Sequence, residues 1–417
     1  MIPRQAAVVV IGAGPAGLAA ARVLADRGVR AVLVLDRDDA PGGVPRFCHH
    51  LGFGWEYTRR IESGPKFVRR LLGALDPAVV TIATRTTVLD LRPGPEIEIV
   101  GADCGPARIR AGAVVVATGI RERSRAARLV PGRRPERGIL TTGQLQQMVA
   151  RGVPVGGRHA VIVGTEHVSF SVLLTARRAG LEIVAMVEPL DRVMSYAGIG
   201  WAARTVLGVP IHLSSRIDDI AGGEAVESVV IHGPSGSFAL PCDTVIFTGD
   251  FLPDANLTRT SGAAIDPRTG GPIVDQRGRT SLPGVFAAGN LLRAVESGGI
   301  AALEGASVGA NAAAYVGGAL DWTDDAPPVQ LGDGLAYLVP QCWDRKRAVA
   351  TAIATLPISL RSSTDADRRR LSLSEAGQEM WSSGPIRPLR QRRIKMPAAA
   401  FERLSGGGPV MLNLIAI

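Results

Sequence analysis

Aromatic residues and cysteines are scarce in this chain of 417 residues. Only 4% of its residues are Phe, Trp or Tyr, which argues against aromatic recognition surfaces. The four cysteines, Cys48, Cys104, Cys242 and Cys342, form no CxxC or CxxxxC pair, so the sequence predicts neither a disulfide scaffold, a zinc ribbon nor a local redox dithiol. The six His residues show no recognisable ligand set, and no metal site is expected.

Uninterrupted hydrophobic runs are also missing. Glycines break the apolar segment 6–21, which therefore indicates a phosphate-binding turn rather than a signal peptide. The segment Ile300–Leu320 has one charged residue, Glu304, but its Ala and Gly content favours a helix packed closely inside a protein over a membrane span. We expect a soluble, cytoplasmic protein with no membrane span.

The length and composition indicate a multidomain globular protein. Apolar residues make up 46% of the chain, and 417 residues exceed what one hydrophobic core usually serves, so two or three domains are expected. The 50 Gly residues are about 12% of the chain against a typical 7%, which favours tight turns and close backbone packing.

Positive charge is concentrated near the C-terminus. The chain carries a net charge of +9, and residues 343–403 hold 13 Arg and Lys against 6 Asp and Glu, a net charge of +7. No nucleic-acid-binding signature accompanies this excess, so no nucleic-acid partner is expected. A docking face for a protein partner and a merely solvated face are the two open interpretations.

The N-terminus has the pattern of a dinucleotide-binding unit. An apolar strand pattern, Ala6–Ile11, meets GAGPAG, then a helical pattern up to Gly28, then a second strand pattern that ends at Asp36. The first glycine of GAGPAG permits a tight turn, the second lets the backbone approach a pyrophosphate, and the third lets the helix lie close to the strand. The acid that ends the second strand can accept hydrogen bonds from ribose hydroxyls.

A second unit of the same design begins at His159, but its turn has lost the glycine pattern. The sequence GTEHVS places Glu166 and Ser169 where the second and third glycines belong, and Glu188 ends the following strand. The Glu166 carboxylate would oppose a pyrophosphate through both its volume and its charge. A structural relic is the favoured interpretation; a working NAD(P) site and a mononucleotide site are the alternatives.

Three further strand-and-turn signals predict that the second unit is inserted into the first. They are AVVVATGI, ending at Ile120, TVIFTGDFLPDAN, starting at Thr244, and TSLPGVFAAGN, ending at Asn290. The expected fold class is α/β, with two Rossmann-like domains and a small β-rich C-terminal unit. The expected domains are a nucleotide-binding domain of 1–120 with 245–325, an inserted, degenerate NAD(P)-binding-like domain of 121–244, and a β-rich docking domain of 326–417. Its strand patterns lie at 334–341, 355–362, 369–374 and 386–396.

On these motifs, residues 5–325 resemble the pyridine nucleotide-disulfide oxidoreductase superfamily, whose glutathione-reductase-like members contain two dinucleotide-binding domains and bind FAD. The segment Gly42–Leu71, GGVPRFCHHLGFGWEYTRRIESGPKFVRRL, is similar to one branch: the FAD-binding α subunits of opine oxidase, hydrogen cyanide synthase and the hydroxyproline and proline dehydrogenases. Many of those proteins end in a cysteine-rich segment that holds a [2Fe–2S] cluster. Here only Cys342 lies beyond residue 325, so no cluster is expected from this chain alone.

The resemblance implies a set of FAD-binding residues. The turn and its acid would bind the adenosine diphosphate part, the strand around Val88 would contact adenine, and Asn290 replaces the usual Asp near the ribityl chain. The helix near Gly299 would point its N-terminus at the flavin pyrimidine ring. The candidate cofactor-binding residues are Gly12, Gly14, Pro15, Ala16, Gly17, Asp36, Arg37, Gly43, Arg46, Val88, Thr118, Gly119, Gly289, Asn290, Gly299 and Ile300.

Cys48 and His50 are the candidate catalytic residues. Cys48 occupies the loop that carries the redox cysteine pair in disulfide reductases, but it has no partner at that spacing. A contact with flavin or substrate and a buried structural thiol are both open for Cys48, and the second is favoured. For His50, proton handling is the functional interpretation.

The resemblance implies an FAD-dependent oxidoreductase and leaves three functions open. The first is the electron-transferring subunit of a heteromeric amine, amino-acid or opine dehydrogenase or oxidase, with a second flavoprotein subunit, and in some complexes a small redox subunit, as partners. The second is a self-sufficient NAD(P)H-dependent flavin reductase. The third is a nucleotide-binding scaffold without turnover. The altered turn at Glu166 favours the first or third over the second.

Overall fold

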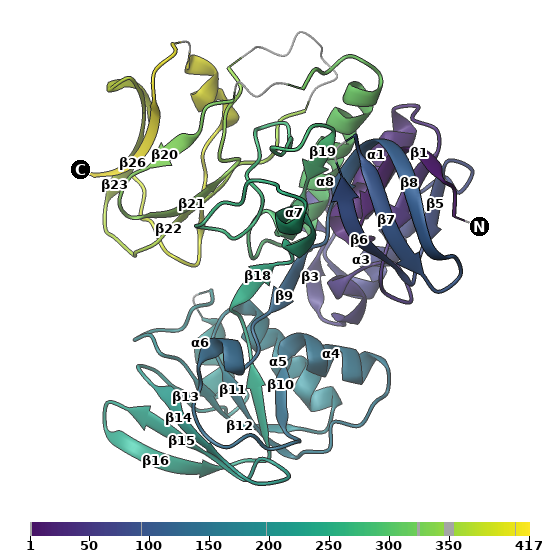
Figure 1. Ribbon diagram of the computed structural model, residues 1–417. Helices are drawn as coiled ribbons and strands as arrows, with labels where there is room; N and C mark the ends of the chain where they lie inside the picture. The colour runs from purple at the N-terminus through teal and green to yellow at the C-terminus, as the bar shows by residue number, and fades with distance from the viewer. Residues whose placement is uncertain (1, 93, 197, 323–325, 346–353, 405) are drawn as a thin grey trace. The chain divides into compact units, whose positions relative to one another are not determined.

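A computed structural model describes residues 2–92, 94–196, 198–322, 326–345, 354–404 and 406–417 (Figure 1). The chain divides into two compact units. Unit 1 contains Met1–Arg46, Leu51–Ile120 and Leu252–Ile417, and unit 2 contains Phe47–His50 and Arg121–Phe251. The chain passes between them in β9 (Ile120–Glu122) and β18 (Phe251–Pro253), which pair with each other.

Unit 1 is built on a seven-stranded sheet. Its parallel strands, in spatial order, are β5 (Val80–Ala83), β2 (Val32–Leu35), β1 (Gln5–Ile11), β8 (Gly105–Val116) and β19 (Val285–Ala287). The antiparallel strands β7 (Glu96–Gly101) and β6 (Thr86–Arg92) continue from the first half of β8. The apolar runs of β1, β2 and β8 are buried on both faces, which is typical of parallel strands covered by helices.

Two helices of unit 1 pack unusually closely because small residues line their contact. The helices of this unit are α1 (Pro15–Asp26), α2 (Trp55–Thr58), α3 (Gly64–Leu72), α7 (Asn256–Thr260) and α8 (Gly298–Val316). A Cβ at Gly305 of α8 would lie 1.9 Å from the carbonyl oxygen of Ala16 in α1. The Ala and Gly content of residues 300–320 is therefore explained by packing inside the protein. None of the helices within the described ranges is long and apolar enough to cross a membrane.

The C-terminal part of unit 1 is β-rich, as predicted, and has its own hydrophobic core around Leu360, Leu371 and Leu373. One sheet has the order β20 (Val329–Leu331), β26 (Val410–Ala416), β23 (Arg369–Glu375) and β24 (Gln378–Ser382), and the other has β21 (Leu335–Val339), β22 (Ser359–Ser362) and β25 (Arg393–Ile394). Of the strand expected over 386–396, only Arg393–Ile394 is a strand, and β20, β24 and β26 were not predicted.

Buried ion pairs join these strands to the rest of unit 1. Asp344, which is fully buried, binds Arg277 at 3.1 Å and Arg279 at 2.8 Å, and Arg279 also binds Asp275. Burial raises the pKa of Asp275, and the charge and hydrogen bonds of Arg279 oppose that rise. Exposing these charged groups to solvent would break their ion pairs. The buried pairs therefore stabilise the contact of the C-terminal strands with the rest of unit 1.

Unit 2 is a second Rossmann-like unit. Its parallel sheet has the order β10 (Ile139–Thr141), β17 (Thr244–Phe247), β11 (His159–Val163), β12 (Glu182–Val187) and β13 (Ile211–His212), with helices α4 (Thr142–Ala150), α5 (His167–Arg178) and α6 (Ile199–Thr205). An antiparallel sheet, β14 (Arg216–Ala221), β15 (Ser228–Gly233) and β16 (Gly236–Pro241), completes it. We expected the chain to return to the first domain at residue 245, but β17 pairs with β10 and β11, so the return comes one strand later.

Candidate functional site

The first glycine turn lies at the carboxyl ends of the parallel strands of unit 1 and is compact on its inner side. A Cβ at Gly12, whose φ is +105°, would lie 2.4 Å from the carbonyl oxygen of Ala117, and a Cβ at Gly17 would lie 1.8 Å from that of Gly12. At Gly14, by contrast, no described atom beyond Gly14 and its two chain neighbours lies within 4 Å of the Cβ position. The turn is therefore open on the side of Gly14, where α1 begins and presents its free N–H groups.

Asp36, the acid after β2, is held beside this turn. Its Oδ2 accepts a hydrogen bond from the backbone N–H of Ala13 at 2.6 Å, and its Oδ1 accepts one from Asp38 at 2.8 Å. Each carboxylate oxygen retains a further lone pair for a ligand hydroxyl. The backbone N–H of Thr86 donates to the carbonyl of Asp36, so the structure brings Thr86 to this position. Val88 lies further along β6, in register with Ile99 of β7.

The loop after Asp36 folds back on the glycine turn. A Cβ at Gly43 would lie 3.1 Å from the Cα of Gly14, so the two backbones are in contact. Arg46 stabilises the loop through the carbonyl of Ala40 at 2.7 Å and through ion pairs with Asp38 and Asp39. Arg37 instead forms an ion pair with Asp254 at 3.2 Å.

The remaining predicted residues of unit 1 converge on the same edge of the sheet. The Thr118 hydroxyl donates to the carbonyl of Asp254, and the Asp254 N–H donates to Gly119. A Cβ at Gly289 would lie 2.7 Å from the Cβ of Ala16, just inside α1. Asn290 uses its amide to bind the backbone of Glu296, at 3.1 and 2.9 Å. Its side chain therefore shapes the loop in front of α8.

A fully buried ion pair, Arg293–Glu304, fixes the backbone at Gly289. The Arg293 guanidinium contacts both carboxylate oxygens of Glu304 and also the carbonyl of Gly289 at 3.0 Å. Glu304 accepts the Gly289 N–H at 3.2 Å. Burial raises the pKa of Glu304, and the charge and hydrogen bonds of Arg293 oppose that rise.

Sequence reasoning missed Glu56, which lies at the N-terminus of α8. Its Oε1 accepts a hydrogen bond from the hydroxyl of Ser297, the N-cap residue, at 2.8 Å. Its Oε2 is buried, has no hydrogen-bond partner in the described structure, and would lie 2.2 Å from a Cβ at Gly299. The Ile300 N–H is bound by Ser297. The helix N-terminus thus accommodates a negative charge, as its dipole favours. The segment FGWEYT contains no recognisable signal for this contact.

The residues of unit 1 fit a dinucleotide. The glycine turn is compact where it meets β1 and open at Gly14, the ribose-type acid lies beside it, and the N-terminus of α8 lies within the same unit. The fit rests on backbone positions that a side chain would fill.

The corresponding turn of unit 2 is filled by its own side chain. The Glu166 carboxylate accepts hydrogen bonds from the hydroxyls of Ser169 at 2.9 Å and Thr248 at 3.3 Å. Its oxygens would lie 2.5–2.6 Å from Cβ atoms built at Gly249 and Gly164. A carboxylate therefore occupies the space between the glycine turn and the end of β17.

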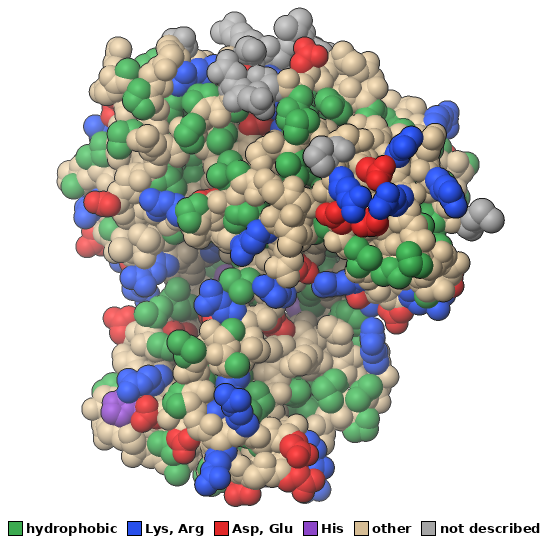
Figure 2. All heavy atoms as spheres, viewed as in Figure 1, with side chains coloured by type: hydrophobic (Ala, Val, Ile, Leu, Met, Phe, Trp, Pro, Cys, Tyr) green, Lys and Arg blue, Asp and Glu red, His purple; other side chains and the backbone are tan. Residues whose placement is uncertain are grey.

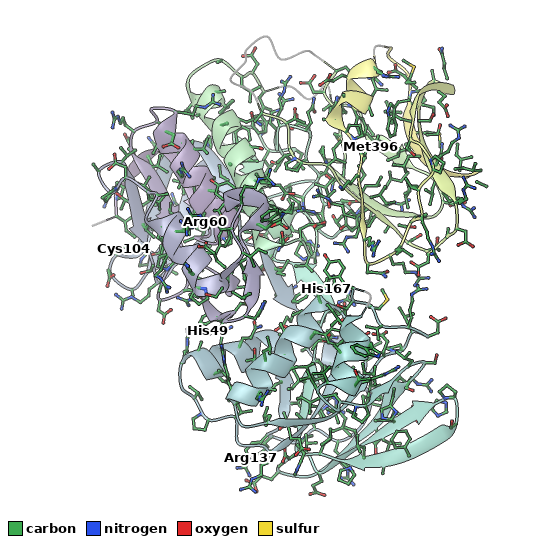
Figure 3. The ribbon with its side chains drawn as sticks, turned by 180° about the vertical axis from the view of Figure 1, so that it is seen from behind. His49, Arg60, Cys104, Arg137, His167 and Met396 are labelled. Carbon is green, nitrogen blue, oxygen red and sulfur yellow. The ribbon has the colours of Figure 1, made fainter. Side chains whose placement is uncertain are left out.

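The loop after β12 covers the same turn. The Met194 N–H donates to the Thr165 hydroxyl at 3.0 Å, and the Ser195 hydroxyl is 2.6 Å from Nδ1 of His167, the first residue of α5 (Figure 3). The Tyr196 ring lies 3.9 Å from that of His167. Glu188, the acid that follows β12, is buried and bound to Thr165, and burial raises its pKa.

Cys48 and His50 lie in the short segment that belongs to unit 2. The Cys48 thiol is 4% exposed and lies 3.4 Å from the side-chain oxygen of Gln146. Burial, with a smaller contribution from the Glu122 charge, raises the pKa of Cys48 to about 12. The thiolate form that a nucleophile needs is therefore disfavoured near neutral pH, which supports the structural interpretation of Cys48. His50 is half-buried.

Known proteins share this architecture. The sequence profile of the family described as pyridine nucleotide-disulphide oxidoreductase matches residues 6–307. A protein of Agrobacterium tumefaciens (strain Ach5), named as one of the subunits of opine oxidase, is 29% identical over 338 residues, which are 74% of this chain and 64% of that protein. A ferredoxin–NADP reductase of Salinispora arenicola is 30% identical over 302 residues, 69% of this chain and 86% of that protein.

The solved structures show the same fold. Thioredoxin reductase of Lactococcus lactis superimposes with a TM-score of 0.62 at 22% identity, covering 75% of this chain and 99% of that one. The C-terminal β-rich part lies beyond residue 307, where the family profile ends.

Proposed function

Because the chain belongs to the pyridine nucleotide-disulphide oxidoreductase family, whose members are FAD-dependent oxidoreductases, we propose that it is the electron-transferring subunit of a heteromeric dehydrogenase or oxidase acting on an amine, an amino acid or an opine. The observation that carries the proposal is the contrast between the two glycine turns: the first is open at Gly14, and the second is filled by Glu166. The similarity to a protein named as one of the subunits of opine oxidase supports the heteromeric part.

In this proposal the residues of unit 1 hold FAD. The turn 12–17 would receive the pyrophosphate, Asp36 the ribose, and the N-terminus of α8 the flavin end. FAD, when bound, supplies the ability to take up two electrons and release them singly. The Arg293–Glu304 pair keeps the Gly289 backbone in place, and Glu56 holds a negative charge at the N-terminus of α8.

We expect NADH and NADPH to reduce the flavin slowly. Glu166 places a negative charge where a nucleotide pyrophosphate would lie, and unit charges about 4 Å apart repel by about 4 kcal/mol near a protein surface. Stopped-flow absorbance of the purified protein, mixed with excess nucleotide, measures the rate. Glu166→Gly should accelerate reduction about tenfold or more, and Glu166→Gln, which keeps the volume and removes the charge, should give an intermediate rate.

A self-sufficient NAD(P)H-dependent reductase is the second candidate. The similarity to a protein named as a ferredoxin–NADP reductase favours it. Fast, saturable reduction of the unaltered protein by either nucleotide would make it the leading function and would contradict the role assigned to Glu166.

A heteromeric enzyme contains a second chain, which should purify together with this one. The tagged protein, purified from its native host at low salt, should retain a second flavoprotein subunit, and the complex should loosen as salt screens the contacts between charges. Mass spectrometry of the purified complex and of its released flavins is the measurement. A homo-oligomer that oxidises substrate without another chain would overturn this part.

Part of the positive charge of the C-terminal segment is paired within unit 1. Arg345, Arg361 and Arg370 form ion pairs with Glu375, Glu296 and Glu379. On the face shown in Figure 2, basic and acidic side chains are scattered among other side chains over the C-terminal part of the chain. Lys346 and Arg347 lie outside the described residues.

A further inference from the structure

The loop 289–297, between β19 and α8, contributes residues to the proposed FAD site at both of its ends. Gly289 lies against α1 at its start, and Ser297 is the N-cap residue of α8 at its end. Within the loop, the Asn290 side chain donates to the carbonyl of Glu296 and accepts a hydrogen bond from its N–H. A displacement of Glu296 would therefore disturb the start of the loop and also the cap of α8.

Two side chains of β22, Ser359 and Arg361, bind this loop from outside it. The Ser359 hydroxyl donates to Oε1 of Glu296 at 2.8 Å, and the Arg361 guanidinium lies 3.4 Å from the same oxygen. The Arg361 guanidinium also donates to the carbonyl of Val295 at 3.3 Å. Because Ser359 and Arg361 are two residues apart in a strand, their side chains project from the same face. The Glu296 side chain is 8% exposed, so these donors replace hydrogen bonds that water would otherwise supply.

The position of β22 is fixed by its neighbour β21, which belongs to two hydrophobic cores of unit 1. Tyr337 and Val339 of β21 are buried in the core of the main sheet, whereas Leu338 is buried in the C-terminal core. β21 pairs with β22, whose Leu360 is fully buried in the C-terminal core. β22 therefore presents its two polar side chains to the loop from a fixed position.

These contacts come from outside the part of the chain that the family profile matches. The profile covers residues 6–307, so the loop lies within the shared architecture and β22 lies beyond it. We propose that Ser359 and Arg361 are positioning residues of the FAD site, which hold the loop 289–297 in its binding position through Glu296. The C-terminal strands are then a part of the flavin-binding site. The proposal rests on the proposed function, in which the N-terminus of α8 receives the flavin end of FAD.

The loss of these contacts should weaken the binding of FAD. A loop without them populates conformations that do not bind, and the apparent affinity falls in proportion to the fraction that does. Ser359→Ala/Arg361→Gln should raise the dissociation constant of FAD about tenfold, or about 1.4 kcal/mol, the scale of one to two net hydrogen bonds. Flavin fluorescence, followed while FAD is added to the full-length protein freed of flavin, measures this constant. Circular dichroism verifies that each variant is folded at the temperature of the titration.

The chain offers a matched control in β23. There Arg370 and Ser372, also two residues apart in a strand, bind the carboxylate of Glu379 in the neighbouring β24. Arg370→Gln/Ser372→Ala removes the same two kinds of donor from the same part of the chain and should leave the affinity for FAD unchanged. If this control weakens FAD binding as strongly as the β22 variant, the loss reflects a general weakening of the C-terminal strands and the proposal is wrong.

A double-mutant cycle determines whether the effect passes through Glu296. Glu296→Ala alone should also weaken FAD binding about tenfold, and the two β22 substitutions added to it should weaken binding little further, because their partner is already gone. Fully additive losses would refute the role of Glu296 as the link. An unchanged dissociation constant in the β22 variant would overturn the proposal while the proposed function stands. If the unaltered protein binds no FAD, the proposed function itself fails.

Discussion

Gly14→Glu is expected to give a folded protein that purifies without flavin. Gly14 has a φ of −78°, which any residue can adopt, and the position of a Cβ there is free of described atoms, so the backbone tolerates a side chain. The new carboxylate would project into the open side of the turn, where the pyrophosphate of FAD is proposed to bind. Unit charges about 4 Å apart repel by about 4 kcal/mol, and each 1.4 kcal/mol changes an affinity about tenfold. The affinity for FAD should therefore fall by about a hundredfold or more.

Two alanine variants make this experiment specific. Gly14→Ala should keep FAD because a methyl group fits, whereas Gly17→Ala should destabilise the whole unit because its Cβ would lie 1.8 Å from the Gly12 carbonyl oxygen. Visible absorbance reports the flavin, and circular dichroism reports the fold. A folded Gly14→Glu protein that retains stoichiometric FAD would refute the assignment of this turn.

Asp344→Ala should produce a large loss of stability. Asp344 is fully buried and neutralises two guanidinium groups, of Arg277 and Arg279, and its backbone exchanges hydrogen bonds with the Gln276 side chain. Removal of one partner of a buried ion pair typically costs about 3–5 kcal/mol, because the remaining charge is left without compensation. The C-terminal strands should then detach from unit 1 at a lower denaturant concentration.

Denaturant titration, followed by tryptophan fluorescence to which Trp343 beside the substituted position contributes, measures this effect. Trp343 stacks on Phe401, with 4.3 Å between ring centroids, so it reports the C-terminal core directly. Asp367→Ala is the matched control, since Asp367 forms only an exposed ion pair with Arg387 and should leave the midpoint unchanged. Equal midpoints for Asp344→Ala and the unaltered protein would show that the buried network does not hold the C-terminal strands in place.

The sequence predicted the parts of this fold that depend on local pattern. The apolar runs of β1, β2 and β8 are buried. In the first turn, a Cβ at Gly12 or Gly17 would meet a backbone atom, and the position at Gly14 is open. The altered second turn was also visible, because Glu166 replaces a glycine at a fixed spacing. These features are determined by residues close together in the chain.

The features that the sequence did not predict depend on contacts between distant residues. Glu56 meets Ser297 across 241 residues, and no pattern around either residue marks the pair. The backbone N–H of Thr86, the first residue of β6, binds the carbonyl of Asp36, a contact that no local pattern marks, whereas the contact of Val88 with adenine stays a prediction. The boundary near residue 245 was misplaced by one strand because the apolar run of β17 suits either sheet.

The order of the strands in unit 1 affects how this protein can fold during its synthesis. β8 pairs with β19, and α1 packs on α8. These early segments therefore cannot complete their packing until their partners leave the ribosome, after the whole of unit 2. Apart from Phe47–His50, unit 2 is one continuous stretch, so all of its strands have been synthesised once Phe251 is made. The inserted unit can therefore close its core while the surrounding one is still incomplete, and the glycine turn acquires its neighbour Gly289 only near the end of synthesis.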